Sequence, residues 1–225
     1  METFRRTVGP ETEFGISGLD PAYHQAAIDL AYRAENQCFV KSFPTKSPNL
    51  DLVYQNFSRS IESVILQTAG VALVPWEQAI DTFLHRIDGE PINWWLCGSA
   101  ALAVRGAPIT PRDVDLIVDD SSAHRLGTIL LDGLIEPVIP VQGWFCNWWG
   151  RAFFGSRIEW VGGVGPQADQ PEISDFGPEA SEHLETVCWH RRDIRVPPLE
   201  LQLQVSLRRG LIDRANLIRK LMDSR

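Results

Sequence analysis

The sequence predicts an α/β fold in which helices flank a mixed β-sheet, and three observations support this. Between residues 92 and 161, apolar segments of strand length alternate with segments of helical period. The chain before this region contains helix start signals and helical spacing of apolar residues. After residue 198, apolar residues again recur at helical spacing. We therefore expect a mainly helical N-terminal extension (1–90), an α/β core (91–197) and a C-terminal helical segment (198–225).

The N-terminal extension is expected to contain three helices joined by irregular chain. Residues 1–19 are rich in Gly, Thr, Glu and Pro and are expected to form an irregular arm. Asp20-Pro21 is typical of a helix start, and this helix is expected to end near Gln37. Residues 41–57 hold two prolines and show no clear period, which favours a connector. Hydrophobic spacing predicts two further helices, over 58–69 and 75–87.

The core is expected to alternate strands with helices and to end in a hairpin before the C-terminal helices. A stretch rich in tryptophan (144–154) and an aperiodic loop (165–177) interrupt this alternation. The expected elements are strand 92–97, helix 99–105, strand 113–118, helix 121–131, strand 135–141, strand 157–161 and hairpin 185–196.

Two short motifs in the core carry residues suited to chemistry on phosphates. Asp113 and Asp115 stand two positions apart in a strand, so they project to the same side. Two carboxylates placed in this way repel each other unless a cation lies between them, and a hard divalent ion suits oxygen ligands. Gly98 permits a tight turn, and Ser99 begins the next helix, where free amide groups attract an anion such as a triphosphate.

These motifs resemble those of the nucleotidyltransferase superfamily related to DNA polymerase beta. The superfamily signature is a hydrophobic residue, Gly, and Gly or Ser, then a spacer, then Asp, a hydrophobic residue, Asp or Glu, and a hydrophobic residue. Cys97-Gly98-Ser99 and Asp113-Val114-Asp115-Leu116 satisfy every position. The wider run looks most like the small bacterial branch that includes aminoglycoside and lincosamide nucleotidyltransferases. The resemblance spans residues 90–222 and weakens after 165.

The resemblance implies transfer of a nucleoside monophosphate, AMP from ATP, to a hydroxyl of a small acceptor, as in antibiotic-modifying enzymes that confer antibiotic resistance. It also implies two Mg²⁺ ions, with Mn²⁺ as an alternative, held by Asp113, Asp115 and a third acid on a neighbouring strand. Glu159 stands where the resemblance places this third acid. The alternative for Glu159 is a solvent-facing strand residue paired with Arg157.

Other polar residues near the motifs allow more than one interpretation. Arg112 is a candidate nucleotide contact beside Gly98 and Ser99, but it is equally suited to balancing nearby acids. We expect Arg105 to balance acids, and Asp119 and Asp120 to cap a helix with the serines that follow. The general base for the acceptor hydroxyl stays open between Glu159, Glu182 and Glu185. Related enzymes carry a lysine in the C-terminal helices where Gln204 stands here.

Two rival functions remain open at this stage. One keeps the reaction but uses tRNA or protein as the acceptor, as in toxin-type relatives. The other is a catalytically degenerate protein that binds a nucleotide without turnover. The formal net charge of −8 gives little general attraction to a nucleic-acid backbone.

Bulk properties are those of a globular protein, with 44% hydrophobic and 22% charged residues in a chain of 225. The four cysteines are widely scattered and make no metal-binding or redox spacing. No signal peptide or apolar membrane span is recognisable, so we expect a cytoplasmic protein without a membrane partner. The sequence leaves the oligomeric state open.

Overall fold

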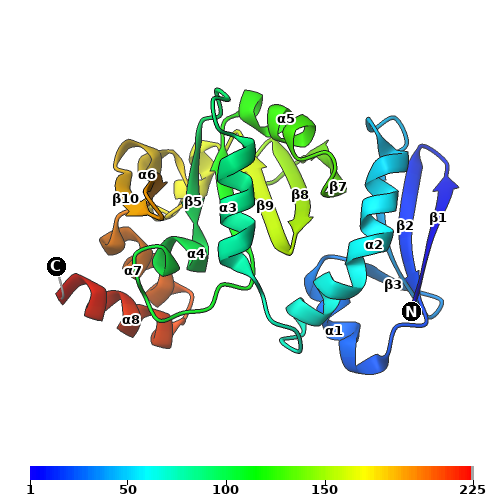
Figure 1. Cartoon of the computed structure of the whole chain (residues 1–225), viewed down its shortest axis with the longest axis horizontal. Coiled ribbons are helices and arrows are strands. Elements are labelled where there is room, and N and C mark those ends of the chain that lie inside the picture. Colours follow the sequence, from blue (N-terminus) through cyan, green and yellow to red (C-terminus); the bar gives the residue numbers. More distant parts are fainter. Residues whose placement is uncertain (224–225) are drawn as a thin grey trace.

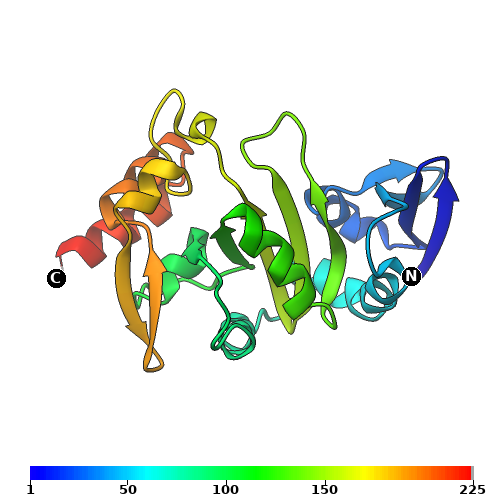
Figure 2. The same cartoon turned by 90° about the horizontal axis from the view of Figure 1, so that it is seen from above.

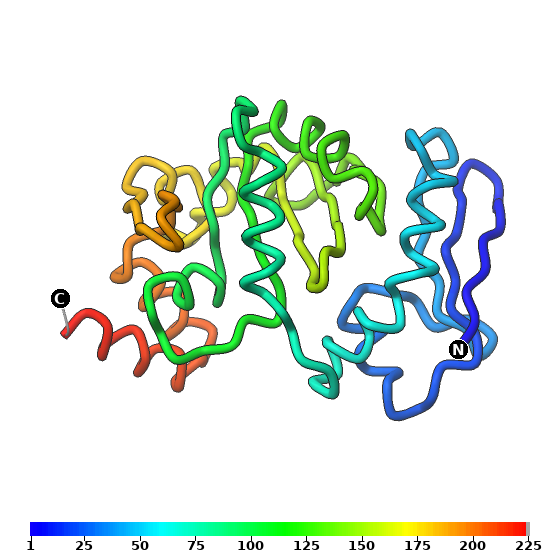
Figure 3. Tube along the Cα trace, in the orientation of Figure 1, coloured from blue at the N-terminus to red at the C-terminus, as the bar shows by residue number. Residues whose placement is uncertain are grey.

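The computed structural model describes residues 1–223 and has a five-stranded mixed sheet at its centre (Figure 1). This confirms the expected α/β class. An N-terminal unit with its own sheet lies at one end of the molecule, and the C-terminal helices lie at the other (Figure 2). The path of the chain between these parts can be followed in the tube of Figure 3.

The central sheet brings together two strands that are far apart in the sequence. Its order is β5-β6-β9-β8-β7, and β6 pairs with β9 in parallel while the other neighbours are antiparallel. The parallel register places Asp115 directly opposite Glu159. The strands are β5 (Trp94–Cys97), β6 (Val114–Val118), β7 (Leu134–Pro140), β8 (Trp148–Phe154) and β9 (Ser156–Gly162).

Helices cover one face of this sheet, and the two acidic residues lie on the other. Leu116 and Trp160 belong to the main core, together with side chains of α3 (Trp76–Arg86) and α5 (Asp120–Ile129). Since side chains alternate along a strand, Asp115 and Glu159 face away from these helices. Their face carries a smaller apolar cluster that includes Trp95, Cys97, Ile117 and Val161. The acids are therefore on the face opposite the main core, beside this smaller cluster.

The N-terminal extension differs from the expectation, because residues 1–19 form a hairpin rather than an irregular arm. Four antiparallel strands in the order β1-β2-β4-β3 pair side by side, and a long helix, α2 (Leu50–Thr68), contacts both this unit and β7. The expected helix from Asp20 ends early, at Asp29, and the expected connector contains the end of β4 and the start of α2. The elements are β1 (Glu2–Val8), β2 (Glu11–Ser17), η1 (Pro21–Tyr23), α1 (His24–Asp29), β3 (Arg33–Glu35) and β4 (Cys38–Pro44).

Cross-strand pairing explains why these strands lack the apolar alternation of a typical sheet. Thr12 and Glu13 are buried in β2, where the Thr12 hydroxyl donates to the Thr45 hydroxyl (3.2 Å) and Arg6 forms an ion pair with Glu13 (2.6 Å). Only Phe14 and Ile16 supply large apolar side chains from this strand to the core. The sequence of these strands is therefore more polar than is usual for a buried sheet.

The rest of the core follows the predicted order, with one difference: most of the tryptophan-rich stretch, which was expected to interrupt the alternation, forms β8. Gly210, with a left-handed φ of +66°, separates the last two helices as expected. Two short helices lie between β9 and the hairpin, one of them in the expected loop. The elements are α4 (Gly98–Ala103), η2 (Pro166–Asp169), α6 (Pro178–Glu182), β10 (Glu185–Trp189), β11 (Arg192–Val196), α7 (Leu199–Arg208) and α8 (Ile212–Asp223).

Within residues 1–223, every helix is too short or too polar to cross a lipid bilayer.

Candidate functional site

Three carboxylates gather on the face of the sheet that points away from α3 and α5. Asp115 and Glu159 are register partners on β6 and β9, and Asp113 immediately precedes β6. One oxygen of each side chain lies within 4.8 Å of an oxygen of both others. We call this group the acid cluster. The structure thus brings together the two acids of the motif and the third acid that the resemblance placed on a neighbouring strand.

The turn at Gly98 closes against the acid cluster. Cys97 pairs with Asp115 across the antiparallel strands β5 and β6. Gly98 follows with φ +67°, and a Cβ at this position would lie 2.5 Å from the Asp115 Oδ2 atom. Only glycine meets both the left-handed conformation and the close approach. Ser99 lines the same cavity as Asp113 and Asp115, so the turn and the acids border one space.

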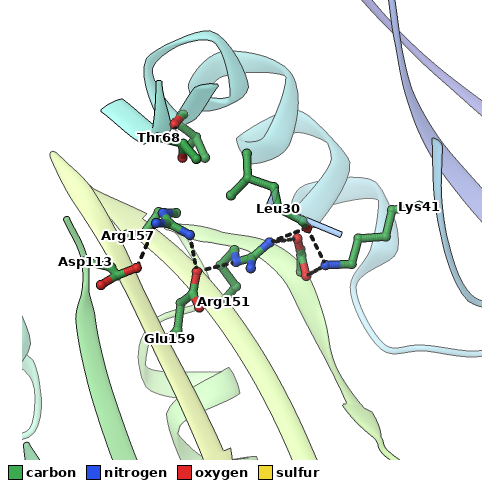
Figure 4. A network of polar contacts seen from close by, with 9 residues as sticks. Leu30, Lys41, Thr68, Asp113, Arg151, Arg157 and Glu159 are labelled. Carbon is green, nitrogen blue, oxygen red and sulfur yellow. Dashed lines mark hydrogen bonds and ion pairs between the residues drawn. The ribbon is translucent and has the colours of Figure 1, made fainter. Parts of the chain in front are cut away.

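Two buried arginines bind part of the acid cluster (Figure 4). The Arg157 guanidinium donates to Asp113 Oδ2 (2.7 Å) and to Glu159 Oε1 (2.7 Å). Arg151 Nε donates to the same Glu159 oxygen (2.8 Å). The pairing of Glu159 with Arg157, which the sequence left as an alternative, is therefore present. Glu159 is nevertheless buried rather than solvent-facing, with 7% relative exposure.

One oxygen of each paired acid stays available. Among residues 1–223, no donor binds Asp113 Oδ1, Glu159 Oε2 or either Asp115 carboxylate oxygen. Arg157 thus holds two acids from one side and leaves their other oxygens beside the unpaired Asp115. This arrangement preserves a set of carboxylate donors for a cation.

The electrostatics of the acid cluster also favour a cation. Burial raises the pKa of Asp115 well above its ordinary value, and the charges of Asp113 and Glu159 raise it further. Burial raises the pKa of Asp113 as well, although the Arg157 charge opposes this shift. Carboxylate oxygens are the ligands that Mg²⁺ prefers, and a divalent ion would relieve the repulsion. The residues present therefore fit a divalent metal ion.

Three cavities border the acid cluster. The first, of about 810 Å³, lies between the Gly98 turn and the C-terminal helices, and we call it the tail cavity. The second, of about 180 Å³, lies among aromatic side chains and is called the aromatic cavity. The third, of about 530 Å³, lies between the N-terminal unit and the central sheet and is called the interdomain cavity. Asp113 lines the tail and interdomain cavities, Asp115 lines the tail and aromatic cavities, and Glu159 lines the aromatic and interdomain cavities.

Basic residues from the C-terminal helices reach the acid cluster. Arg209 and Arg214 line both the tail cavity and the aromatic cavity. The Arg214 Nε atom is buried and has no hydrogen-bond partner among the described residues. Gln204, which replaces the lysine of related enzymes, is exposed on α7. Arg112 is exposed, lines the tail and interdomain cavities, and makes no ion pair within residues 1–223.

Sequence reasoning missed Arg151, Asp175 and Arg214 as neighbours of the acid cluster. Arg151 carried a weak signal, because it is a lone charge in an apolar strand sequence. Asp175 is a buried carboxylate in the wall of the aromatic cavity, and burial raises its pKa against the opposing charge of Arg214. Neither Asp175 nor Arg214 belongs to a local motif that marks it.

The remaining polar candidates have structural partners. Asp119 caps α5 as expected, because its Oδ1 atom accepts from the Ser122 amide (2.7 Å). Arg105 balances an acid as expected, through its ion pair with Glu185 (2.6 Å). Glu182 belongs to an exposed group with Glu179 and His183. Neither Glu182 nor Glu185 lines the three cavities around the acid cluster.

Comparisons with known proteins give structural similarity only. No protein-family model matches this sequence, and no curated protein sequence matches it. A Thermotoga maritima protein assigned as a nucleotidyltransferase is 21% identical, with a TM-score of 0.49 over 66% of this chain and 93% of that one. The lincosamide antibiotic adenylyltransferase LnuA, bound to lincomycin, is 13% identical, with a TM-score of 0.47 over 64% of this chain and 97% of that one.

A further similar structure is the antibiotic-resistance factor ANT(2")-Ia in complex with adenylyl-2"-tobramycin. It is 15% identical, with a TM-score of 0.40 over 64% of this chain and 87% of that one.

Proposed function

We propose that this chain is a Mg²⁺-dependent nucleotidyltransferase that transfers a nucleoside monophosphate from a nucleoside triphosphate, with ATP as the expected donor, to a hydroxyl of a small acceptor. The observation that carries the proposal is the acid cluster, whose three carboxylates lie within 4.8 Å of one another beside the Gly98 turn. Phosphoryl-type transfer depends mainly on positioning and charge stabilisation, which such a cluster supplies through a bound metal.

Asp113, Asp115 and Glu159 would hold the divalent ion, with Mg²⁺ expected and Mn²⁺ as an alternative. When bound, divalent ions offset the charge that builds on the reacting phosphate and favour deprotonation of the attacking hydroxyl. The role of this chain is to keep its carboxylate oxygens in place. Arg157 does so for Asp113 and Glu159 with a single planar guanidinium.

The tail cavity is the proposed site of the triphosphate. Gly98 lets the turn pack directly against Asp115, because a Cβ there would lie 2.5 Å from the Asp115 Oδ2 atom. Ser99 offers a hydroxyl beside the same space. Arg112, Arg209 and Arg214 line this cavity and would offset the negative charge of a triphosphate. These arginines would supply the positive charge that a lysine provides in related enzymes, where Gln204 stands in this chain.

A second candidate function is a nucleotide-binding protein without turnover. The observation that favours it is that Asp113 and Glu159 already bind arginines. If the arginines stayed bound to these carboxylate oxygens after nucleotide binding, the oxygens could not coordinate a metal ion fully. Turnover, rather than binding alone, therefore separates the two candidates.

The test is incubation of the protein with each labelled nucleoside triphosphate, Mg²⁺ and a panel of acceptors, followed by mass analysis of the products. The panel contains aminoglycosides, lincosamides, tRNA and proteins. The proposal expects Mg²⁺-dependent addition of a nucleoside monophosphate to a small acceptor. A tRNA or protein product would redirect the acceptor class, and nucleotide binding without any product would favour the second candidate.

Matched variants connect any activity to the acid cluster. Asp113→Asn and Asp115→Asn are each expected to abolish transfer while the protein stays folded. Glu62→Gln is the control, because Glu62 is an exposed acid on α2 outside the site. Transfer at a rate near that of the wild type in both aspartate variants would remove the proposed metal role.

A further inference from the structure

We infer that the acceptor binds in the interdomain cavity and that the N-terminal unit supplies one wall of this binding site. The inference rests on the proposed function and extends it to residues outside the two motifs. The cavity measures about 530 Å³, which is within the usual range of small-molecule sites. Its lining from the N-terminal unit and α2 consists of Asp29, Ala31, Lys41 and Thr68.

The interdomain cavity reaches two acids of the cluster and shares only Arg112 and Asp113 with the tail cavity. Asp113 and Glu159 line it, whereas Ser99, Arg209 and Arg214 line only the other cavities. A hydroxyl that enters the interdomain cavity would therefore lie beside two acids of the cluster without competing for the tail cavity. Attack and departure from opposite sides of the phosphorus need such a separation.

The wall formed by the N-terminal unit is fixed to the core by a buried chain of ion pairs (Figure 4). Lys41 Nζ on β4 binds Glu136 Oε2 on β7 (2.7 Å), and Glu136 also binds Arg151. The Leu30 carbonyl, from the segment after α1, accepts from both Lys41 (3.2 Å) and Arg151 (3.3 Å). Since Arg151 also holds Glu159, the N-terminal wall and the acid cluster are positioned by the same side chain.

The lining of the cavity identifies the chemical class of the acceptor. Trp144, Trp149, Ile139 and Val141 offer aromatic and apolar surface on the core side. The Trp149 indole N–H is buried and has no partner among residues 1–223, and Trp149 lines both this cavity and the aromatic cavity. A ring compound with several hydroxyls matches this flat apolar surface and would supply an oxygen for the unpartnered donor.

The charges in the cavity do not require an anionic acceptor. Lys41, Arg151 and Arg157 each already bind an acid. Arg112 lines the cavity without an ion pair among the described residues, but it also borders the tail cavity, where the triphosphate is proposed to bind. Asp29 is exposed at the wall, where it accepts only from Gln25 among the described residues (2.8 Å). The cavity therefore suits a neutral or cationic hydroxylated ring compound of saccharide size, and its volume is too small for a folded macromolecule.

The experiment blocks the cavity from two different elements. Thr68→Trp adds bulk at the end of α2, and Asp29→Trp adds bulk at the end of α1. Ser63→Trp is the matched control, because Ser63 is exposed on the same helix as Thr68 and does not line the cavity. Maltose, lincomycin and tobramycin serve as neutral and cationic ring compounds, and a short single-stranded RNA represents the other acceptor class. Binding is followed by tryptophan fluorescence, and transfer by labelled product.

We expect saturable binding of at least one of the three ring compounds by the wild type and by Ser63→Trp. Thr68→Trp and Asp29→Trp are expected to weaken that binding by at least about tenfold, or ~1.4 kcal/mol. Circular dichroism confirms that each variant is folded, and if one of them is not, the other decides the result. Unchanged binding in a folded blocking variant would overturn the inference. So would binding of RNA alone, or no binding of any ring compound up to about 10 mM.

Failure of the inference can be told apart from failure of the proposed function. If the wild type transfers a nucleotide to an acceptor and a folded blocking variant does so equally well, the acceptor binds elsewhere and the proposed function stands. If the wild type binds a ring compound but neither binds nor turns over a nucleoside triphosphate with Mg²⁺, the cavity is a ligand site and the proposed function fails.

Discussion

Replacing Asp115 with asparagine is expected to stabilise the metal-free protein and at the same time remove its activity. The Asp115 carboxylate is unpaired among the described residues, and its oxygens approach those of Asp113 and Glu159 to within 4.8 Å. At an effective dielectric constant of about 20, two charges at that separation repel by about 3 kcal/mol. Arg157 offsets part of this repulsion. We therefore expect a net gain of about 1–2 kcal/mol in the free energy of unfolding.

The assay is urea denaturation of the wild type and Asp115→Asn, once with a chelator and once with Mg²⁺. At a Mg²⁺ concentration ten times its Kd, the wild type should gain about 1.4 kcal/mol, and the variant should gain much less. Asp113→Asn provides a contrast, because it removes an ion pair with Arg157 and should not stabilise the chelated protein. The reasoning is refuted if Asp115→Asn destabilises the chelated protein, or if it gains as much from Mg²⁺ as the wild type.

Three further substitutions have defined expected outcomes. Glu159→Gln should weaken Mn²⁺ affinity by about 10-fold to 100-fold and lower turnover, and unchanged kinetics would leave Glu159 a structural role only. Gly98→Ala should cost about 1–2 kcal/mol in thermal unfolding and lower activity, because φ is +67° and the new methyl group meets Asp115; an equally stable and active variant would contradict this. Burial alone would raise the pKa of Glu136, but its arginine and lysine partners hold that pKa below the ordinary 4.5. Glu136→Gln should therefore destabilise the protein by about 3 kcal/mol above pH ~5, and the difference from the wild type should shrink as pH falls below about 4.5 through the lowered folded pKa. Urea titrations measure this difference in the free energy of unfolding between the wild type and Glu136→Gln. A difference that grows as the pH falls would contradict a lowered pKa for Glu136.

The α/β core and the acid cluster could be predicted from local sequence. The alternation of a strand places Asp113 and Asp115 on one side. Glu159 was assigned as the third acid by the resemblance to the nucleotidyltransferase superfamily. Gly98 was recognisable because a tight turn before a helix needs it. These features depend on residues that are close in sequence or on a strand pattern with a clear period.

The N-terminal sheet and the arginines of the site could not be predicted in this way. β2 buries Thr12 and Glu13 through partners from other segments, Thr45 after β4 and Arg6 on β1, so its sequence lacks the expected alternation. Lys41 and Glu136 are 95 positions apart and meet only in the folded chain. Arg151 joins them to Glu159 through contacts that no local pattern encodes.

The most direct test of the proposed metal site is Mn²⁺ binding measured by electron paramagnetic resonance on the wild type, Glu62→Gln and the double variant Asp113→Asn/Asp115→Asn. The wild type and Glu62→Gln are expected to bind Mn²⁺ with a Kd below about 1 mM, in competition with Mg²⁺, and the folded double variant is expected to lose this binding. Equal Mn²⁺ binding by all three proteins would contradict the assignment of the acid cluster as the metal site.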